Sequence, residues 1–328
     1  MKAYLLSCIF VLSIFVTRVE AEQLQFEHQQ NKLSGHYLAP VKNQKTKSVL
    51  IFVHGDGDMT FDAEGYYTII WQQLREQGYA IFSWDKAGVG KSTGNWLSQS
   101  MIDRQSEVLA AVKFIQQKYN FTAENTGLIG FSQAGWVLPA MAKKNHSIGF
   151  MVGIGFAANW LEQGEYFTQT RLRLAGASKQ QIMTALSENT KEQQFFGRSP
   201  AYSEYVKTAG DDVMSLDRYQ FVLKNYREDA RQDYQKINIP TLLLWGDLDL
   251  NVNAKQEFNW WQLSGNKNDY VKTKLIENAS HGMLKTNEYS SQKFGFKQWL
   301  KLKWQGQKAL ATDFMPTLLL WLENKYDS

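Results

Sequence analysis

A serine lies between small residues at the end of an apolar segment, in residues 130–135, which read GFSQAG. An apolar strand that runs into a serine flanked by glycines is the layout of a nucleophile elbow, where a tight strand-to-helix turn exposes the hydroxyl. Small residues are needed around Ser132 because the strand and helix backbones nearly touch at such a turn. The pattern is common by chance, so its meaning depends on which residues could activate the serine.

A serine becomes an effective nucleophile when a base takes its proton and an acid orients that base. Of the five histidines, His281 stands in a loop after the last expected strand. The strand before it ends in residues 245–252, which contain Asp247 and Asp249. We choose Asp249, because Asp247 is too near the strand end to turn toward the histidine. The sequence therefore predicts a catalytic triad of Ser132, Asp249 and His281.

A glycine-rich turn follows an early apolar strand and reads HGDG at residues 54–57. Such a turn can direct backbone N–H groups at an oxyanion that forms during acyl transfer. The expected donors are the N–H groups of Asp56 and Gln133, with Gly57 as a neighbour. We expect the carboxylate of Asp56 to point away, because its negative charge would oppose an oxyanion. His54 is expected to hold the loop in place.

Two other kinds of site are disfavoured. Residues 84–93 look like a phosphate-binding P-loop, but Asp85 stands where that motif needs a glycine. Gly88 and Gly90 more plausibly shape a tight loop. There is no H-E-x-x-H pair and no His/Asp cluster at ligand spacing, so we expect neither a metal nor a cofactor. His28, His36 and His146 are expected at the surface.

Composition limits the class of partner. The chain has 328 residues and a net charge of +4, and without residues 1–21 it has 34 basic against 31 acidic residues, or +3. This charge is too small and too dispersed to indicate nucleic-acid binding. The acyl-transfer site predicted above makes a small-molecule ester or a short acyl substrate the expected partner.

The N-terminus is typical of a secretory signal peptide. Lys2 is followed by an apolar stretch over 3–16, and Val19 and Ala21 mark a plausible cleavage site. The stretch is shorter than the ~20 residues that span a bilayer, so we expect cleavage and no stable membrane insertion afterwards. The sequence predicts a periplasmic or secreted protein. Cys8 is the only cysteine, so the mature chain would have no disulfide.

Strands and helices are expected to alternate, which favours a mostly parallel central sheet with helices on both faces. Between the core segments 22–155 and 237–328, residues 156–236 are polar and helical in pattern, and we interpret them as a helical cap insertion. The expected strands are 33–38, 48–53, 79–84, 126–131, 148–155, 240–245 and 270–276. The expected helices are 64–77, 101–119, 133–144, 253–263 and 308–325.

The cap and the residues near the elbow are expected to select the substrate. Trp136 follows the elbow directly, and with Trp160 it is our candidate for lining the pocket; packing on the helix face is an equally open interpretation for Trp136. Arg171, Arg173 and Arg198 could recognise a substrate carboxylate, although arginines on polar helices are usually solvated.

The chain resembles the α/β-hydrolase superfamily, and more narrowly its secreted or bacterial esterase and serine-aminopeptidase-like branch. Members of that branch carry an H-G-x-G loop, a D-K-R-G-x-G-K-S-x-G segment and then the elbow. These correspond here to residues 54–57, 85–94 and 130–135. The stretches Gly-Asp-Leu-Asp at 246–249 and Ser-His-Gly at 280–282 extend the resemblance.

Two positions depart from the family pattern: Ala134 replaces the usual second elbow glycine, and Ala87 replaces the usual arginine. The resemblance implies an α/β-hydrolase fold and hydrolysis of an ester, amide or thioester through an acyl-enzyme, without a cofactor. Carboxylic-ester hydrolysis is our first interpretation. A serine aminopeptidase or amidase acting on short peptides is the alternative, followed by an acyltransferase or thioesterase. A binding protein that has lost turnover is the rival from another class.

Overall fold

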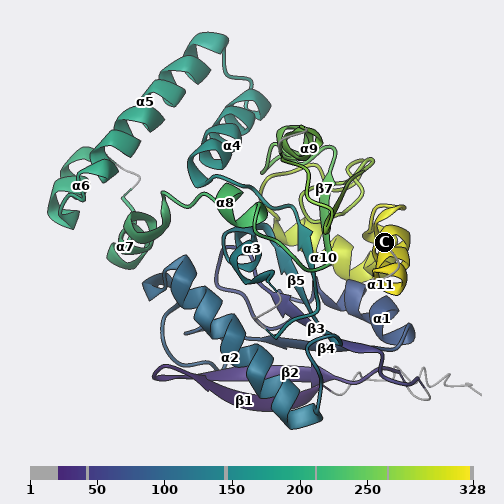
Figure 1. Cartoon of the computed structure of the whole chain (residues 1–328). Helices are drawn as coiled ribbons and strands as arrows, with labels where there is room; N and C mark the ends of the chain where they lie inside the picture. Colours follow the sequence, from purple (N-terminus) through teal and green to yellow (C-terminus); the bar gives the residue numbers. More distant parts are fainter. Residues whose placement is uncertain (1–20, 42–43, 144–146, 211–212, 264–265, 326–328) are drawn as a thin grey trace, which may run out of the picture.

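The computed structural model describes residues 21–41, 44–143, 147–210, 213–263 and 266–325. The predicted signal peptide and His146 lie outside these ranges, except for Ala21. Eight strands form one sheet in the order β1-β2-β4-β3-β5-β6-β7-β8 (Figure 1). β2 is antiparallel to both of its neighbours, and the remaining pairs are parallel. This is the mostly parallel sheet that the sequence predicts.

The strands follow the apolar segments closely. Every residue of β3, β4, β5, β6 and β7 is buried, as expected for parallel strands covered on both faces. The sequence prediction misses β1, an edge strand whose polar residues give no apolar run. The strands are β1 (Glu22–His28), β2 (Asn31–Leu38), β3 (Ser48–Val53), β4 (Tyr79–Trp84), β5 (Thr126–Phe131), β6 (Phe150–Ile154), β7 (Thr241–Gly246) and β8 (Val271–Ile276).

Helices cover both faces of the sheet. α1 (Thr68–Glu76), α10 (Phe296–Gln305) and α11 (Phe314–Asn324) pack on one face. α2 (Met101–Tyr119), α3 (Leu138–Met141), α8 (Arg231–Tyr234) and α9 (Ala254–Gln262) pack on the other. Short 3₁₀ turns lie at Trp96–Ser98, Ser132–Trp136 and Gly306–Ala309. Within the described ranges, no helix combines the length and apolarity that crossing a membrane requires.

Two helices differ from the sequence prediction. The helix expected over 133–144 is instead a 3₁₀ turn followed by the four residues of α3. Pro139 stands at the start of α3, where a missing N–H and a fixed φ favour a new helix start over a continuing helix. α10 was not predicted at all. The polar and apolar residues of 289–305 give no clear boundary before it.

The remaining helices form a layer at the upper left of Figure 1. These are α4 (Trp160–Leu174), α5 (Lys179–Gly197), α6 (Tyr202–Thr208) and α7 (Leu216–Asn225). The chain enters and leaves this layer at one point, where Asn159 and Asp229 form an isolated bridge and the Ala230 N–H donates to the Ala158 carbonyl at 2.8 Å. We call residues 159–229 the cap and this point its neck.

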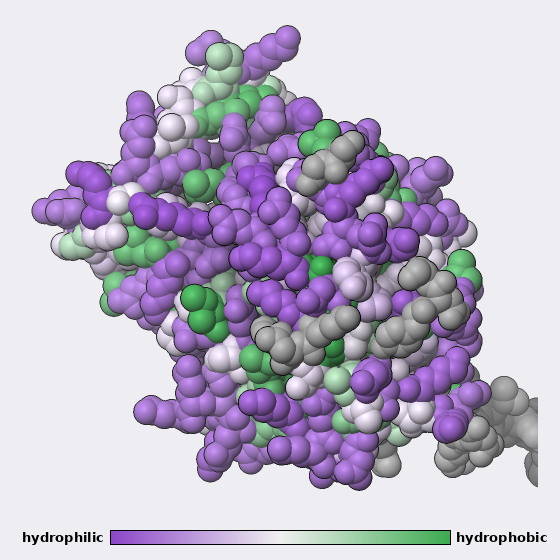
Figure 2. All heavy atoms as spheres, in the orientation of Figure 1, coloured by the Kyte–Doolittle hydropathy of each residue, from purple (hydrophilic) through white to green (hydrophobic). Residues whose placement is uncertain are grey.

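On the face in Figure 2 the surface is mainly hydrophilic, with small hydrophobic patches.

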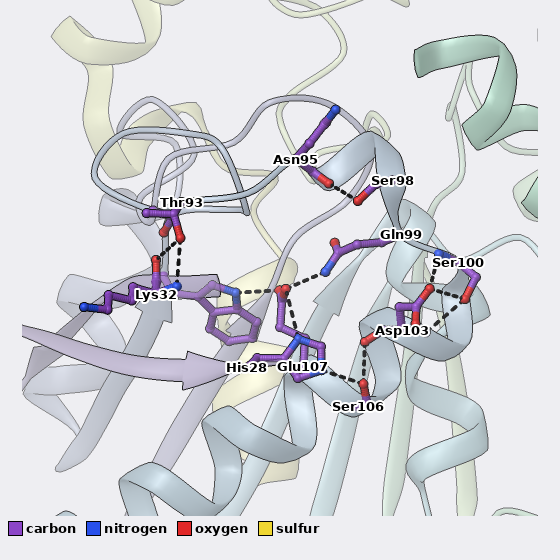
Figure 3. A network of polar contacts seen from close by, with 12 residues as sticks. His28, Lys32, Thr93, Asn95, Ser98, Gln99, Ser100, Asp103, Ser106 and Glu107 are labelled. Carbon is purple, nitrogen blue, oxygen red and sulfur yellow. Dashed lines mark hydrogen bonds and ion pairs between the residues drawn. The ribbon is translucent and has the colours of Figure 1, made fainter. Parts of the chain in front are cut away.

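A network of polar contacts joins the β1–β2 hairpin, the loop before α2 and α2 itself (Figure 3). The Lys32 N–H donates to the Thr93 hydroxyl at 2.8 Å, and Gln99 donates to the Glu107 carboxylate at 2.6 Å. Ser100 caps α2 by accepting from the Asp103 N–H at 3.1 Å. These contacts fix the long loop that follows β4 and carries residues 85–99.

Candidate active site

Ser132 sits at the elbow that the sequence predicts. It follows β5 and has φ of +51°, a left-handed conformation that is strained for a residue with a side chain. A Cβ on Gly130 would lie 2.5 Å from Leu138 Cδ1, and one on Gly135 would lie 2.9 Å from Phe156 Cβ. Both positions therefore need glycine, while Ala134 is accommodated in the buried interior.

His281 and Asp249 are directly bonded. The His281 Nδ1 lies 2.7 Å from Asp249 Oδ2, and the other carboxylate oxygen accepts from the N–H groups of Asn251 and Val252 at 2.7 and 2.9 Å. Burial alone would lower the pKa of His281, but the charge and hydrogen bond of Asp249 outweigh burial and raise it. Gly155, at φ +63°, follows β6, and a Cβ there would lie 2.9 Å from the His281 ring.

One cavity of 290 Å³ brings the elbow and the histidine together. Its lining includes Ser132, His281, Gly55 and Asp56. The loop is close to the nucleophile, since a Cβ on Gly55 would be 3.2 Å from the Ser132 Cβ. The carboxyl ends of β3, β5 and β8 thus deliver the expected groups to one place.

A second cavity of 600 Å³ adjoins the first and shares His281, Tyr66 and Met59 with it. We call it the apolar pocket. Most of its wall comes from the segment between β8 and the end of α10. None of the described residues that line these two cavities belongs to the predicted insertion 156–236. The large apolar and aromatic lining residues are Met59, Tyr66, Leu250, Leu284, Tyr289, Phe294, Phe296, Trp299 and Leu302.

The loop of residues 54–57, which we call the oxyanion loop after its predicted role, is held by a buried lysine. Lys86 Nζ donates to the carbonyl oxygens of Gly55 and Gly57, both at 2.9 Å. In a trans peptide the carbonyl and the following N–H point in opposite directions. Because the Gly55 carbonyl faces Lys86, the Asp56 N–H faces away from it. The Gly57 N–H is directed at the Asp56 carboxylate.

His54 is a structural residue of this loop. Its Nε2–H donates to the Trp84 carbonyl at 2.6 Å, and its Nδ1 lies 3.3 Å from the Tyr67 hydroxyl. Burial lowers the pKa of His54 to about 3, so the ring stays neutral. Its own carbonyl accepts from Arg104 at 2.6 Å.

The side chains of Asp56 and Gln133 are bonded to each other. Gln133 Nε2 donates to Asp56 Oδ1 at 2.9 Å, and Gln133 Oε1 accepts from Arg104 at 2.6 Å. Arg218, from cap helix α7, donates to both Asp56 oxygens at 3.1 and 3.0 Å. Burial alone would raise the pKa of Asp56, but Arg218, with help from Lys86, holds it below its usual value. The carboxylate thus points at the cap.

The other predicted substrate contacts lie elsewhere. Trp136 is 8% exposed, stacks on Trp160 at a ring distance of 4.7 Å and donates to the Ala158 carbonyl. This pair packs the cap neck onto the core, which corresponds to the packing interpretation of Trp136. Arg171, Arg173 and Arg198 line neither cavity, and a different cap arginine reaches the oxyanion loop. The sequence alone does not show which arginine of a polar helix reaches the core, because all of them carry the same charge.

His28 is buried, which differs from the expected surface position, because it anchors β1 on α2. Its Nε2 lies 2.6 Å from the Ser106 hydroxyl, but its Nδ1 is 3.9 Å from Glu107, beyond hydrogen-bond distance (Figure 3). Both Glu107 oxygens accept from other groups, Trp84 and Gln99. Ser106, His28 and Glu107 thus combine a serine, a histidine and an acid as a triad does, but their contacts are structural.

The P-loop-like segment is also structural. Asp85 accepts from the N–H groups of Phe61 and Lys91 at 2.8 and 3.2 Å, so a carboxylate occupies the centre of the loop. A Cβ on Gly90 would lie 2.4 Å from Asp85 Oδ2. In the described part of the chain, no group of three or more His, Cys, Asp or Glu residues is arranged to hold a metal ion.

Comparisons with solved structures support the predicted α/β-hydrolase fold. The Pyrococcus furiosus esterase Pf2001 is 17% identical with a TM-score of 0.54, covering 89% of this chain and 91% of its own. The esterase domain of a Rhodothermus marinus protein is 16% identical with a TM-score of 0.51, covering 88% and 98%. The Pyrococcus horikoshii acylaminoacyl peptidase is 15% identical with a TM-score of 0.51, covering 89% and 42%. At these identities the likeness concerns the fold.

A comparison with curated protein sequences found no match. The family profile described as "Serine aminopeptidase, S33" matches residues 44–288. This range includes the elbow, His281 and residues 247–253, the loop that carries Asp249 and that we call the acid loop. Since this match spans well over half of the chain, the protein belongs to the serine aminopeptidase S33 family of α/β serine hydrolases.

Proposed function

We propose that this protein hydrolyses carboxylic esters through an acyl-enzyme formed on Ser132. One observation carries the proposal: His281, bonded to Asp249 at 2.7 Å, borders the same cavity as the strained elbow serine. A nucleophile, a base and an orienting acid at one cavity are the arrangement that acyl transfer needs.

The reaction has two halves. The Ser132 hydroxyl oxygen attacks the ester carbonyl carbon while His281 Nε2 takes its proton, and the carbonyl oxygen becomes an oxyanion. His281 then protonates the departing alkoxide, the carbon–oxygen bond breaks and an alcohol leaves. A water molecule attacks the acyl-enzyme in the same way, releases the carboxylic acid and restores Ser132. Asp249 stabilises the histidine cation, and the N–H groups of Asp56 and Gln133 bind the oxyanion.

The apolar pocket favours an ester with an uncharged, hydrophobic group. Its wall is aromatic and aliphatic, and its volume lies within the usual range of ligand pockets. Glu64 is the one charged residue among those that line it. Apart from His281, a substrate carboxylate would find no cation among the residues that line this wall.

A fluorophosphonate probe with peptide mapping tests the proposal. We expect the label on Ser132, and no label or turnover in Ser132→Ala. A panel of p-nitrophenyl esters of increasing chain length should show turnover that rises from acetate toward longer acyl groups. An unlabelled Ser132 in folded protein would exclude a serine hydrolase.

A serine aminopeptidase is the second candidate, and it is favoured by the family description and by Glu64 at the pocket wall. An aminopeptidase needs an anion for the free amino group of its substrate, and Glu64 could supply it. Aminoacyl anilides test this: turnover of anilides alone, lost in Glu64→Gln, would replace the esterase proposal. An acyltransferase or thioesterase would share the acyl-enzyme and would be recognised by thiol or alcohol acceptors.

We also propose that residues 1–21 are removed on export. The first strand, β1, begins at Glu22, so cleavage after Ala21 leaves the sheet intact. Expression of the full chain in a bacterium with an export pathway, followed by mass spectrometry of the exported protein, should identify Glu22 as the first residue. An intact N-terminus would contradict this.

A further inference from the structure

We propose that Arg218, on cap helix α7, is a positioning residue that aligns the oxyanion hole through its ion pair with Asp56. The inference rests on the proposed function, because it assigns the cap a role in that same reaction. It concerns a residue 162 positions away from Asp56 in the chain.

The ion pair has a defined geometry. Arg218 reaches the two Asp56 oxygens with separate nitrogens, at 3.1 and 3.0 Å, which fixes the orientation of both planar groups. The guanidinium also lies over two rings, 5.9 Å from the centre of Trp96 and 5.2 Å from that of Phe221. The Trp96 ring receives Lys86 as well, at 4.3 Å. These ring contacts therefore orient the Arg218 guanidinium independently of Asp56.

The ion pair continues into both expected oxyanion donors. Asp56 supplies one N–H, and its carboxylate binds the side chain of Gln133, which supplies the other. Gln133 is held in turn by Arg104, which also binds the His54 carbonyl at the start of the loop. A shift of Asp56 would thus change the separation of the two N–H groups directly.

The two ends of this chain of contacts have different surroundings. Arg104 and Gln133 are 4% and 3% exposed, whereas the side chains of Arg218 and Asp56 are 33% and 45% exposed. A partly exposed ion pair contributes little to folding. Its removal should therefore leave the fold intact while releasing the outer side of the oxyanion loop, which Lys86 and Arg104 hold from the inner side.

The test compares Arg218→Ala with wild-type protein on one p-nitrophenyl ester. Oxyanion donors act mainly in the transition state, so loosening them lowers kcat more than it changes KM. We expect kcat to fall about tenfold with KM within about twofold, a smaller loss than deletion of a donor causes. Arg218→Lys, which can make only one of the two contacts, should give an intermediate kcat. Added methylguanidinium should partly restore Arg218→Ala.

Arg231→Ala is the matched control. Arg231, on α8 beside the cap neck, also has carboxylate ion pairs and 31% side-chain exposure, but its partners are the cap residues Glu162 and Asp229, away from the oxyanion loop. Its kcat should stay within about twofold of wild type. Asp56→Asn should reproduce the loss of Arg218→Ala, and combining the two should add little, because they break the same contact.

The outcomes separate the inference from the function beneath it. If wild-type protein turns over esters and Arg218→Ala keeps the wild-type kcat, or loses no more than Arg231→Ala, the inference is wrong and the esterase stands. Additive losses in the double variant would also overturn it. Should Arg218→Ala fold poorly, a wild-type kcat in both Arg218→Lys and Asp56→Asn would overturn it as well. If Ser132 of the wild-type protein is unlabelled, the proposed function fails and the inference fails with it.

Discussion

The two sides of the proposed triad differ in composition, and we call them the polar side, at the oxyanion loop, and the apolar side, at the apolar pocket. On one side Lys86, Arg104 and Arg218 surround the oxyanion loop, and the last of them comes from the cap. On the other side none of the described residues that line the apolar pocket belongs to the cap, and they are mainly aromatic and aliphatic. Under the proposed function, reaction geometry and substrate fit are assigned to separate regions. Substitutions should therefore affect kcat on one side and chain-length preference on the other.

The cap also contacts the acid loop. The Tyr166 hydroxyl donates to the Asp249 carbonyl at 2.8 Å, and Gln163 donates to the Asn251 carbonyl at 2.9 Å. Both belong to α4, whereas Arg218 belongs to α7. The cap thus holds two of the loops that carry the proposed catalytic groups. It also contacts the wall of the apolar pocket, because Gln292 in that wall donates to the Phe167 carbonyl of α4 at 3.1 Å, although no described cap residue lines the pocket itself.

The largest effect should come from the group that both sides share. Asp249→Asn keeps the shape of the acid loop but no longer holds the His281 tautomer, so kcat should fall about 10⁴-fold for every ester tested. Steady-state kinetics with acetate and octanoate esters measure this. Unequal losses for the two esters would mean that the triad and the pocket are not independent.

The same variant tests the pH dependence. The base must be neutral to accept a proton, and Asp249 raises the pKa of His281, so wild-type kcat/KM should be lost as the pH falls through this raised value. In Asp249→Asn the acid limb should move to lower pH. A limb that does not move would mean that another group controls it.

The next largest effect should come from Lys86→Met, on the polar side. The Gly55 and Gly57 carbonyls would lose their buried donor, and the peptide that orients the Asp56 N–H would be free to turn. We expect kcat to fall about tenfold or more for all chain lengths. Lys91→Met, on the same loop but bonded to Gln23 at the surface, is the control and should retain wild-type kcat.

The apolar side should respond in the opposite way. Phe294 is 47% exposed at the pocket wall, so a long acyl chain could cover it. Phe294→Ala should lower kcat/KM about five- to tenfold for octanoate through loss of apolar contact, and change acetate by less than about twofold. Equal losses for both esters would contradict the division between the two sides.

The sequence predicted those parts of the site that follow single strands. Ser132 comes directly after β5, Asp249 and His281 lie in the loops after β7 and β8, and parallel strands bring their carboxyl ends to one edge. The order of these strands then places the three residues near each other, without any knowledge of side-chain contacts. The predicted fold class follows from the same alternation.

The contacts around the oxyanion loop could not be predicted in this way. The pair of Asp56 and Arg218 depends on how the cap lies on the core, and no local pattern reports that. One signal was present: Arg104 falls on the apolar stripe of α2, between Met101 and Val108. A charged residue on a buried stripe needs a partner, which points toward a structured polar network. The apolar pocket had no such signal, since its wall is mostly irregular chain.

The smallest expected effect concerns the cap neck. Glu257, on α9, is 8% exposed and accepts from the Ala158 N–H at 3.2 Å. Burial raises its pKa from 4.5 to about 7, although the Ala158 hydrogen bond opposes this. A carboxyl whose folded pKa is raised stabilises the fold at low pH, and this contribution is lost as the pH rises through the folded value. Glu257→Gln keeps an acceptor and cannot ionise.

We therefore expect Glu257→Gln to match the wild-type melting temperature at pH 5 and to exceed it by a few degrees at pH 8. Calorimetry or circular dichroism at the two pH values measures this, and an offset that is equal at both would contradict the assignment. Since the oxyanion loop and the apolar pocket are untouched, neither kcat nor chain-length preference should change. A change in kcat alone would mean that ionisation of Glu257 alters the oxyanion loop. A change in chain-length preference would mean that the cap influences the shape of the apolar pocket.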